Sequence, residues 1–214
     1  DTPRYLQQGT IAIEDRDFYT NQGFSITGYL RAIRNIFLLK GLSGGSTLTQ
    51  QLVKTVLLSP EKTLPRKIKE LMLSIQVDRR YSKDQILEMY LNDVGYGGTA
   101  VGVQAAAQSY FNKDVKNLNL AESAFLAGLP QSPTTYSPFG GNDYYLARTK
   151  NVLSAMVRDG YINQKQAEAA YSEIKNMKFS QSETGIKAPH FVMYVRQQLV
   201  KQFGEQVVES GGLR

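Results

Sequence analysis

This chain is organised around the stretch Gly44-Gly-Ser-Thr-Leu-Thr-Gln-Gln-Leu-Val-Lys54. Its two glycines allow a turn in which the backbone approaches a ligand closely, and Ser46 or Thr47 can then cap a helix. Within that helix Ser46, Gln50 and Lys54 recur at i, i+4 and i+8, which places a hydroxyl, an amide and an ammonium on one face. The stretch therefore predicts a helix with one polar face and one apolar face.

A second helix is predicted just downstream, because Pro65 suits the first turn of a helix. One of its faces is cationic with a single carboxylate, and the opposite face is an apolar stripe. The charged residues are Lys62, Arg66, Lys69 and Glu70, and the apolar residues are Leu64, Ile68, Leu71 and Ile75. The sequence thus predicts a cationic wall with one carboxylate set into it, and a solvated basic face is the alternative.

Length and composition limit the possible classes of protein. A chain of 214 residues can form one large domain or two small lobes, and its net charge of +6 favours nucleic acid, an acidic membrane surface or a phosphorylated substrate as partner. The absence of cysteine excludes disulfides and thiolate metal sites, and the single histidine, His190, argues against a histidine metal cluster or a Ser-His-Asp triad. No apolar run reaches the roughly 18–20 residues of a membrane span, so any native anchor is expected upstream of Asp1.

The N-terminal part contains two segments of interest. A helix over Leu6–Ile13 is predicted to deliver Glu14 to the edge of a cavity, although a carboxylate beside an arginine is more often a surface ion pair than a catalyst. The segment Ile26–Leu42 interleaves apolar residues with Arg and Lys. This pattern favours a segment that lies on a membrane surface, and a buried core helix is the alternative.

Strand signals are scarce, so the sequence predicts an all-α protein. The segment 92–98 is a glycine-rich turn without the spacing of a dinucleotide or Walker loop, and 131–142 is a loop rich in Pro, Ser, Thr and Gly. Further helices are expected over 64–80, 82–91, 101–111, 120–128, 144–158, 164–175 and 189–203.

Four motifs occur in the order and spacing of the peptidoglycan glycosyltransferases, glycosyltransferase family 51, which the chain resembles from about Leu6 to Lys175. They are Glu14-Asp15-Arg16-Asp17-Phe18, Gly44–Lys54, Arg66-Lys67-Ile68-Lys69-Glu70 and Tyr90-Leu91-Asn92. The family includes monofunctional transglycosylases and the polymerising domains of class A penicillin-binding proteins. The chain departs from the family pattern at Asn21, where histidine is usual, and at Ser25, where aspartate is frequent.

The resemblance implies a lysozyme-like large lobe and a small membrane-facing jaw, with a cleft between them. The glycosyltransferase domain is expected over residues 1–180, with the jaw inserted at about 24–45. Residues 181–214 are expected to form a C-terminal helix and the start of a linker to a transpeptidase domain, because the final Gly-Gly-Leu-Arg resembles such a linker. The implied location is the outer face of the bacterial cytoplasmic membrane.

The resemblance also implies the reaction. Lipid II serves as donor and acceptor, and the 4-hydroxyl of the acceptor GlcNAc attacks the anomeric carbon of the growing glycan chain with inversion, releasing undecaprenyl pyrophosphate. The residue types fit this chemistry, because a hydroxyl nucleophile needs a carboxylate base and a pyrophosphate leaving group needs positive charge. A hydrolase would instead need a protonated carboxyl and would gain little from a cationic wall. Moenomycin-type inhibitors are expected ligands, and nucleic acid is not.

By resemblance, Glu14 is the base and Glu70 is the second carboxylate, directed toward the pyrophosphate and a divalent cation. Mg²⁺ or Mn²⁺ would suit carboxylate and pyrophosphate oxygens, and Glu70 is the candidate metal ligand. The other expected site residues are Arg31 for the donor phosphate; Lys54, Lys62, Arg66 and Lys69 for the pyrophosphate; Ser46, Gln50 and Gln51 as hydrogen-bonding groups; and Asp15 and Phe18 as supports of the base. Arg66 and Lys67 could alternatively form ion pairs that hold the fold.

Two other functions are compatible with parts of the pattern. A lysozyme-like lytic enzyme would share the fold but cut finished glycan. A non-enzymatic basic module would bind an anionic membrane or nucleic acid without needing Glu14 or Glu70. Nucleic-acid binding would require aromatic residues beside the basic face, whereas the tyrosines here are scattered along the chain.

Overall fold

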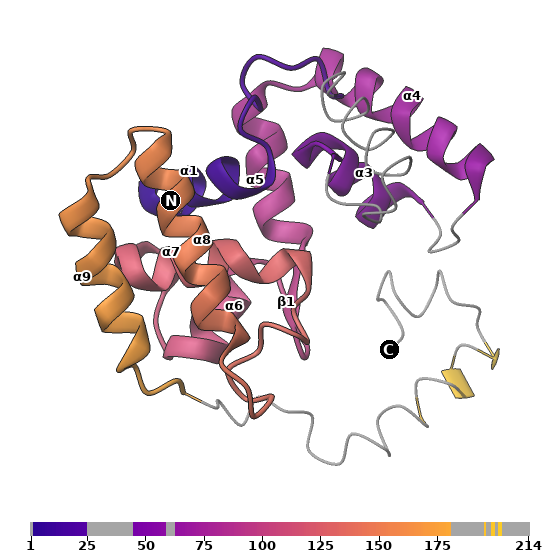
Figure 1. The fold of residues 1–214 in the computed structure, drawn as a ribbon. Coiled ribbons are helices and arrows are strands. Elements are labelled where there is room, and N and C mark those ends of the chain that lie inside the picture. Colours follow the sequence, from indigo (N-terminus) through magenta and orange to yellow (C-terminus); the bar gives the residue numbers. More distant parts are fainter. Residues whose placement is uncertain are drawn as a thin grey trace. The chain divides into compact units, whose positions relative to one another are not determined.

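The computed structural model describes residues 2–24, 45–58 and 63–180, together with residues 195, 198, 199, 201 and 202. The described part is helical apart from one two-stranded sheet, which confirms the predicted all-α class (Figure 1). In chain order the elements are α1 (Arg4–Glu14), α3 (Leu48–Leu57), α4 (Leu64–Arg80), α5 (Lys83–Asp93), β1 (Gly95–Gly97), β2 (Ala100–Val101), α6 (Val103–Phe111), the 3-10 turn Val115–Asn117, α7 (Leu120–Gly128), the 3-10 turn Leu129–Gln131, α8 (Tyr144–Arg158) and α9 (Gln164–Lys175).

The chain divides into two units, Asp1–Ser180 and Gln181–Arg214, and all of these elements belong to the first. The predicted jaw at about 24–45, including the Ile26–Leu42 segment, falls almost entirely outside the described residues. The cleft expected beside the jaw therefore stays a prediction. None of the helices in the described ranges combines the length and the apolar character needed to cross a bilayer.

The core of the first unit forms where α1, α7, α8 and α9 pack together (Figure 1). Helix α7 is buried from Ala121 to its C-terminus, because its small and apolar residues face neighbours on every side. Gly9 of α1 lies against α7, where an added Cβ would come within 3.2 Å of Ala127 Cβ. A glycine at this crossing thus lets two helices approach closely, and it fixes the course of α1 toward its C-terminal residue, Glu14.

Helix α3 lies against α4 and α5 on another side of the unit (Figure 1). The helix predicted from the GGSTLTQQLVK stretch is confirmed, and Thr47 is its cap. Thr47 Oγ1 accepts a hydrogen bond from Gln50 N at 3.2 Å, and Gln50 Oε1 accepts one from Thr47 N at 3.0 Å. This reciprocal pair is a capping box, which satisfies two backbone donors at the start of the helix.

Helix α4 begins with Pro65 in its first turn, as predicted. Its apolar stripe is only partly covered, since Ile68 and Met72 are 53% and 58% exposed. Val56 and Leu57 at the end of α3 are also exposed. The apolar face of α4 is therefore not a core face along its whole length in the described part of the chain.

The predicted glycine-rich turn, 92–98, contains β1, which forms an antiparallel hairpin with β2 just after the turn. Helix α6 begins at Val103 rather than at the predicted 101, because Gly102 before it has a φ of 78°. An added Cβ at Gly102 would lie 2.5 Å from Asn92 O. Only glycine fits this combination of left-handed backbone and close approach.

Candidate active site

Glu14 lies at the C-terminal end of α1, where side chains from α8 and α3 meet it. Arg148 Nη2 donates to Glu14 Oε1 at 2.6 Å, and Gln51 Nε2 donates to Glu14 Oε2 at 3.0 Å. The hydroxyl of Tyr90 on α5 donates a hydrogen bond to Gln51 Oε1 at 3.2 Å. The side chains of Glu14 and Arg148 are each 10% exposed. Both carboxylate oxygens are therefore held in a partly buried network that joins four helices.

Asp15, the next residue, connects α1 to the start of α3. Its carboxylate accepts a hydrogen bond from Leu48 N at 3.0 Å and two from Asn21 Nδ2 at 3.0 Å each. Burial raises the pKa of Asp15, although the Leu48 N–H, the Asn21 amide and the Lys83 charge act in the opposite direction. Asp15 therefore fixes the end of α1 against the first turn of α3, and its role as a support of the base stays a prediction.

Asn21, one of the departures from the family pattern, connects Asp15 to a lysine. While its amide nitrogen donates to Asp15, its Oδ1 accepts from Lys83 Nζ at 3.1 Å. Lys83 also forms an ion pair with Asp78 and lies 5.0 Å from the centre of the Phe18 ring. Phe18 is fully buried, which fits its predicted supporting position. Ser25 lies outside the described residues.

Glu70 forms a second cluster, on α4. Its Oε2 accepts from Arg66 Nη1 at 3.1 Å and its Oε1 pairs with Lys67, whose Nζ also donates to Ser46 Oγ at 3.3 Å. The Glu70 side chain is 2% exposed. Arg66 and Lys67 therefore form ion pairs with Glu70, as the alternative in the sequence analysis stated. Glu70, the carboxylate predicted within the cationic wall, is buried.

The described part of the stretch, 45–54, reaches both clusters: Ser46 accepts from Lys67 of the Glu70 cluster, and Gln51 donates to Glu14. Gln50 differs from its neighbour, because it is 1% exposed and its carbonyl oxygen closes the capping box. The prediction that Ser46, Gln50 and Lys54 share one polar face is wrong for Gln50, because the cap turns this side chain inward. Lys54 and Lys69 are exposed, and Arg31 and Lys62 lie outside the described residues.

Arg148 and Lys83 are the residues in these networks that sequence reasoning missed. Arg148 lies 134 positions from Glu14, and it is one of several basic residues in its region. Lys83 opens α5 and contacts Asn21, 62 positions away. No local pattern indicates either pairing, since helical periodicity relates only residues of the same helix.

The described residues do not fit the divalent cation that the resemblance implies. They contain no group of three or more Asp, Glu or His side chains able to hold a metal ion. Glu70 is buried with each oxygen bonded to a cation, so a metal ion there would have to displace Arg66 or Lys67. Mg²⁺ usually retains several waters and one or two accessible carboxylates, and Glu70 does not offer that arrangement.

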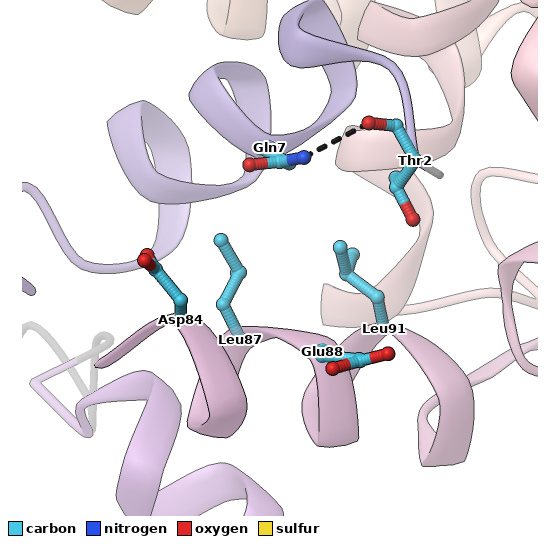
Figure 2. Close-up of a pocket in the computed structure, with 6 residues that line it drawn as sticks. All are labelled: Thr2, Gln7, Asp84, Leu87, Glu88 and Leu91. Atoms are coloured by element: carbon cyan, nitrogen blue, oxygen red, sulfur yellow. Dashed lines mark hydrogen bonds between the residues drawn. The ribbon is translucent and has the colours of Figure 1, made fainter. Parts of the chain in front are cut away.

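A groove of about 300 Å³ lies between α1 and α5, apart from these clusters (Figure 2). Leu87 and Leu91 form its floor, and Asp84 and Glu88 lie at its edge. On the opposite side, Gln7 donates a hydrogen bond to Thr2 O at 2.9 Å. The described residues that line this groove include none of the predicted site residues. The candidate site is therefore the Glu14 network together with the Glu70 cluster.

A helical fold that holds one carboxylate with an arginine and a second carboxylate with two cations is compatible with the glycosyltransferase domain that the motifs predict. Comparison with known proteins agrees: a family model described as Transglycosylase matches residues 1–157. The chain belongs to the transglycosylase family, the peptidoglycan glycosyltransferases.

The chain is similar to several penicillin-binding proteins. It is 42% identical to penicillin-binding protein 1A of Escherichia coli (strain K12) over 211 residues, which cover 98% of this chain and 25% of that protein. It is 38% identical to penicillin-binding protein 1F of Bacillus subtilis (strain 168), covering 98% of this chain and 30% of the relative. The crystal structure of penicillin-binding protein 1A from Haemophilus influenzae matches with a TM-score of 0.54 and 27% identity, covering 96% of this chain and 21% of that one. The chain thus spans about a quarter of the length of the curated relatives it matches.

Proposed function

We propose that this chain polymerises lipid II into glycan strands, with Glu14 as the general base. The observation that carries the proposal is the position of Glu14, whose two oxygens are held by Arg148 and Gln51 in a partly buried network. A carboxylate that takes a proton from a sugar hydroxyl must be fixed within hydrogen-bond reach of it. In this proposal Glu14 accepts the proton of the acceptor 4-hydroxyl as that oxygen bonds to the anomeric carbon of the growing chain.

The departing group is undecaprenyl pyrophosphate, and it leaves from the side opposite to the attack. Developing negative charge on its oxygens needs fixed cations and donors. Arg66 supports this assignment, because its Nε is buried without a hydrogen-bond partner among the described residues, and such a donor can be satisfied by a phosphate oxygen. Lys54, Lys69, Arg31 and Lys62 are proposed to add positive charge, and Glu70 keeps Arg66 and Lys67 in place.

The cellular setting is part of the same proposal. The substrates are lipids, so the chain is proposed to work at the outer face of the cytoplasmic membrane, with the Ile26–Leu42 segment on the membrane surface. A transpeptidase domain in the full-length protein is proposed from the relatives, which are about four times as long as this chain. Moenomycin-type phosphoglycolipids are proposed to compete with the growing chain.

The first experiment removes only the basic oxygen of the proposed base. Glu14→Gln keeps the shape of the side chain but cannot accept the proton, so polymer formation from lipid II is expected to fall to the detection limit while moenomycin still binds. Glu88→Gln on α5 is the matched control, because Glu88 is exposed and lies at the separate groove. Full polymer yield from Glu14→Gln would disprove the base assignment.

Two added arms of the same assay test the divalent cation and the lytic alternative. Titration of EDTA tests the divalent cation that the resemblance implies and that the described residues do not fit: lost activity that Mg²⁺ or Mn²⁺ restores would show that the reaction needs a cation, and unchanged activity would agree with the described residues. Incubation with purified sacculi tests the lytic alternative, because release of muropeptides without polymer formation from lipid II would favour a hydrolase.

A further inference from the structure

We propose that Arg148 is a positioning residue that orients the Glu14 carboxylate for proton transfer; the inference rests on the proposed role of Glu14 as base. Arg148 Nη2 and Glu14 Oε1 are 2.6 Å apart, and both side chains are 10% exposed. A charge-assisted hydrogen bond of this length, shielded from water, is a strong orienting contact. Arg148 acts through Glu14, since its contact is with the carboxylate.

Arg148 is itself fixed by two further contacts on its guanidinium. Its Nε donates to Gly128 O at 3.0 Å, at the end of α7, and its guanidinium carbon lies 5.6 Å from the centre of the Tyr136 ring. Two nitrogens of one rigid plane therefore serve two acceptors at once. A lysine ammonium could keep the charge near Glu14 but could not reproduce this geometry.

Gly128 leaves room for the stem of Arg148. An added Cβ at Gly128 would lie 2.9 Å from Arg148 Cγ, closer than side chains normally approach. The backbone of Gly128 is ordinary helix, with φ −80° and ψ −23°. Alanine is therefore compatible with the backbone at this position, and its effect would be to push the arginine stem away from α7.

The result is a carboxylate whose rotation is blocked from two sides. Arg148 holds Oε1, Gln51 holds Oε2, and Tyr90 in turn holds Gln51. Each carboxylate oxygen still has a second lone-pair site, which can accept the proton of a sugar hydroxyl. A fixed carboxylate plane matters because displacement of a reacting group by about 1 Å can cost on the order of 100-fold in rate.

The test compares variants of Arg148 and Gly128 in the lipid II polymerisation assay, with melting temperature measured for each. Arg148→Ala is expected to lower kcat by about 100-fold with KM for lipid II little changed. Arg148→Lys is expected to recover at least about tenfold of that loss, because the charge at Glu14 returns without the second hydrogen bond. Gly128→Ala removes no charge, and it is expected to lower kcat to a level between wild type and Arg148→Ala.

Arg158→Ala is the matched control, because Arg158 lies on the same helix and donates to Ala12 O of α1 at 3.1 Å without contacting Glu14. Its kcat is expected to be near wild type. The double variant Gly128→Ala/Arg148→Ala should be no slower than Arg148→Ala, since both changes act through one side chain.

The outcomes separate this inference from the proposed function. If a folded Arg148→Ala keeps its kcat, or if Arg158→Ala loses as much, the inference is overturned while an inactive Glu14→Gln still supports the base. If Glu14→Gln remains active, the proposed function itself fails. If Arg148→Ala does not fold, the test rests on Arg148→Lys and Gly128→Ala. A wild-type kcat in both of these variants would overturn the inference.

Discussion

Glu14 and Asp15 are adjacent carboxylates whose surroundings give them different tasks. Glu14 is met by side chains of Arg148 and Gln51, whereas Asp15 is buried and accepts a backbone hydrogen bond from Leu48. The N-terminus of a helix stabilises the charged form of a nearby carboxylate, whereas burial away from water destabilises the charged form. For Asp15 the effect of burial is the larger, so its pKa is raised above the usual 3.8.

The raised pKa of Asp15 predicts a pH dependence of stability. The folded protein holds the Asp15 proton more tightly than the unfolded chain does, so proton binding at Asp15 stabilises the fold. This contribution is full below the pKa of Asp15 in the unfolded chain, and it is lost as pH rises through the pKa of Asp15 in the folded protein. Urea unfolding of wild type and Asp15→Asn across a pH series should show the difference in free energy of unfolding, wild type minus variant, falling from about pH 4 upward. A difference that grows with pH would mean that the Leu48 and Asn21 hydrogen bonds outweigh burial.

At the scale of elements, α3 connects the two clusters of the candidate site. Just before its N-terminal cap, Ser46 accepts a hydrogen bond from Lys67 of the Glu70 cluster, and about one turn later Gln51 reaches Glu14. The start of α3 is fixed by the Thr47 capping box and by the bond from Thr47 Oγ1 to Gly23 O at 2.8 Å. The position of this helix start therefore determines whether both clusters form together.

Thr47→Ala is expected to lower the free energy of unfolding by about 1–2 kcal/mol, because the α3 cap and the bond to Gly23 O are both lost. Thr55→Ala is the control, since Thr55 is exposed on the same helix and its hydroxyl donates to Gln51 O, and it should change the free energy of unfolding by less than about 0.5 kcal/mol. Urea unfolding followed by circular dichroism measures both. Equal effects of the two changes would contradict a special role of the cap.

At the scale of the whole molecule, the packed unit extends beyond the residues matched by the family model. The match ends at residue 157, whereas α9 packs against α7 and α8 with Ile174 fully buried. Phe179 joins an aromatic cluster in which its ring centre lies 4.8 Å from that of Phe125, and Ser180 N donates to Tyr110 O at 2.9 Å. Residues 158–180 therefore complete the core of this unit.

Two truncations test where the folded unit ends. A chain ending at Ser180 keeps α9 and the aromatic cluster, so it is expected to unfold in one cooperative transition near the melting temperature of the full chain. A chain ending at Val157 exposes the apolar faces of α7 and α8 that α9 covers, and it is expected to lose cooperative unfolding. Thermal scans by circular dichroism distinguish them. A cooperative transition in the shorter chain would show that α9 is dispensable.

The sequence by itself predicted the helices of the described residues from Arg4 to Lys175, and it left the cap of α3 open between Ser46 and Thr47. Thr47 and Pro65 act on their immediate neighbours, so their effects are visible in the sequence. Arg66 and Lys67 reach Glu70 because residues three and four apart on a helix are adjacent in space. The motifs also predicted Glu14 as the base by resemblance, since its neighbours in the sequence follow the pattern of the family.

Only the tertiary structure decided which partners hold Glu14. Arg148 reaches it from 134 positions away, through the packing of α8 on α1 and the space left at Gly128. The same packing placed Gln51 of α3 against the carboxylate, whereas its neighbour Gln50 is turned inward by the cap of its own helix. The physical reason is that helical periodicity fixes which residues share a face, whereas the packing of helices fixes what that face meets.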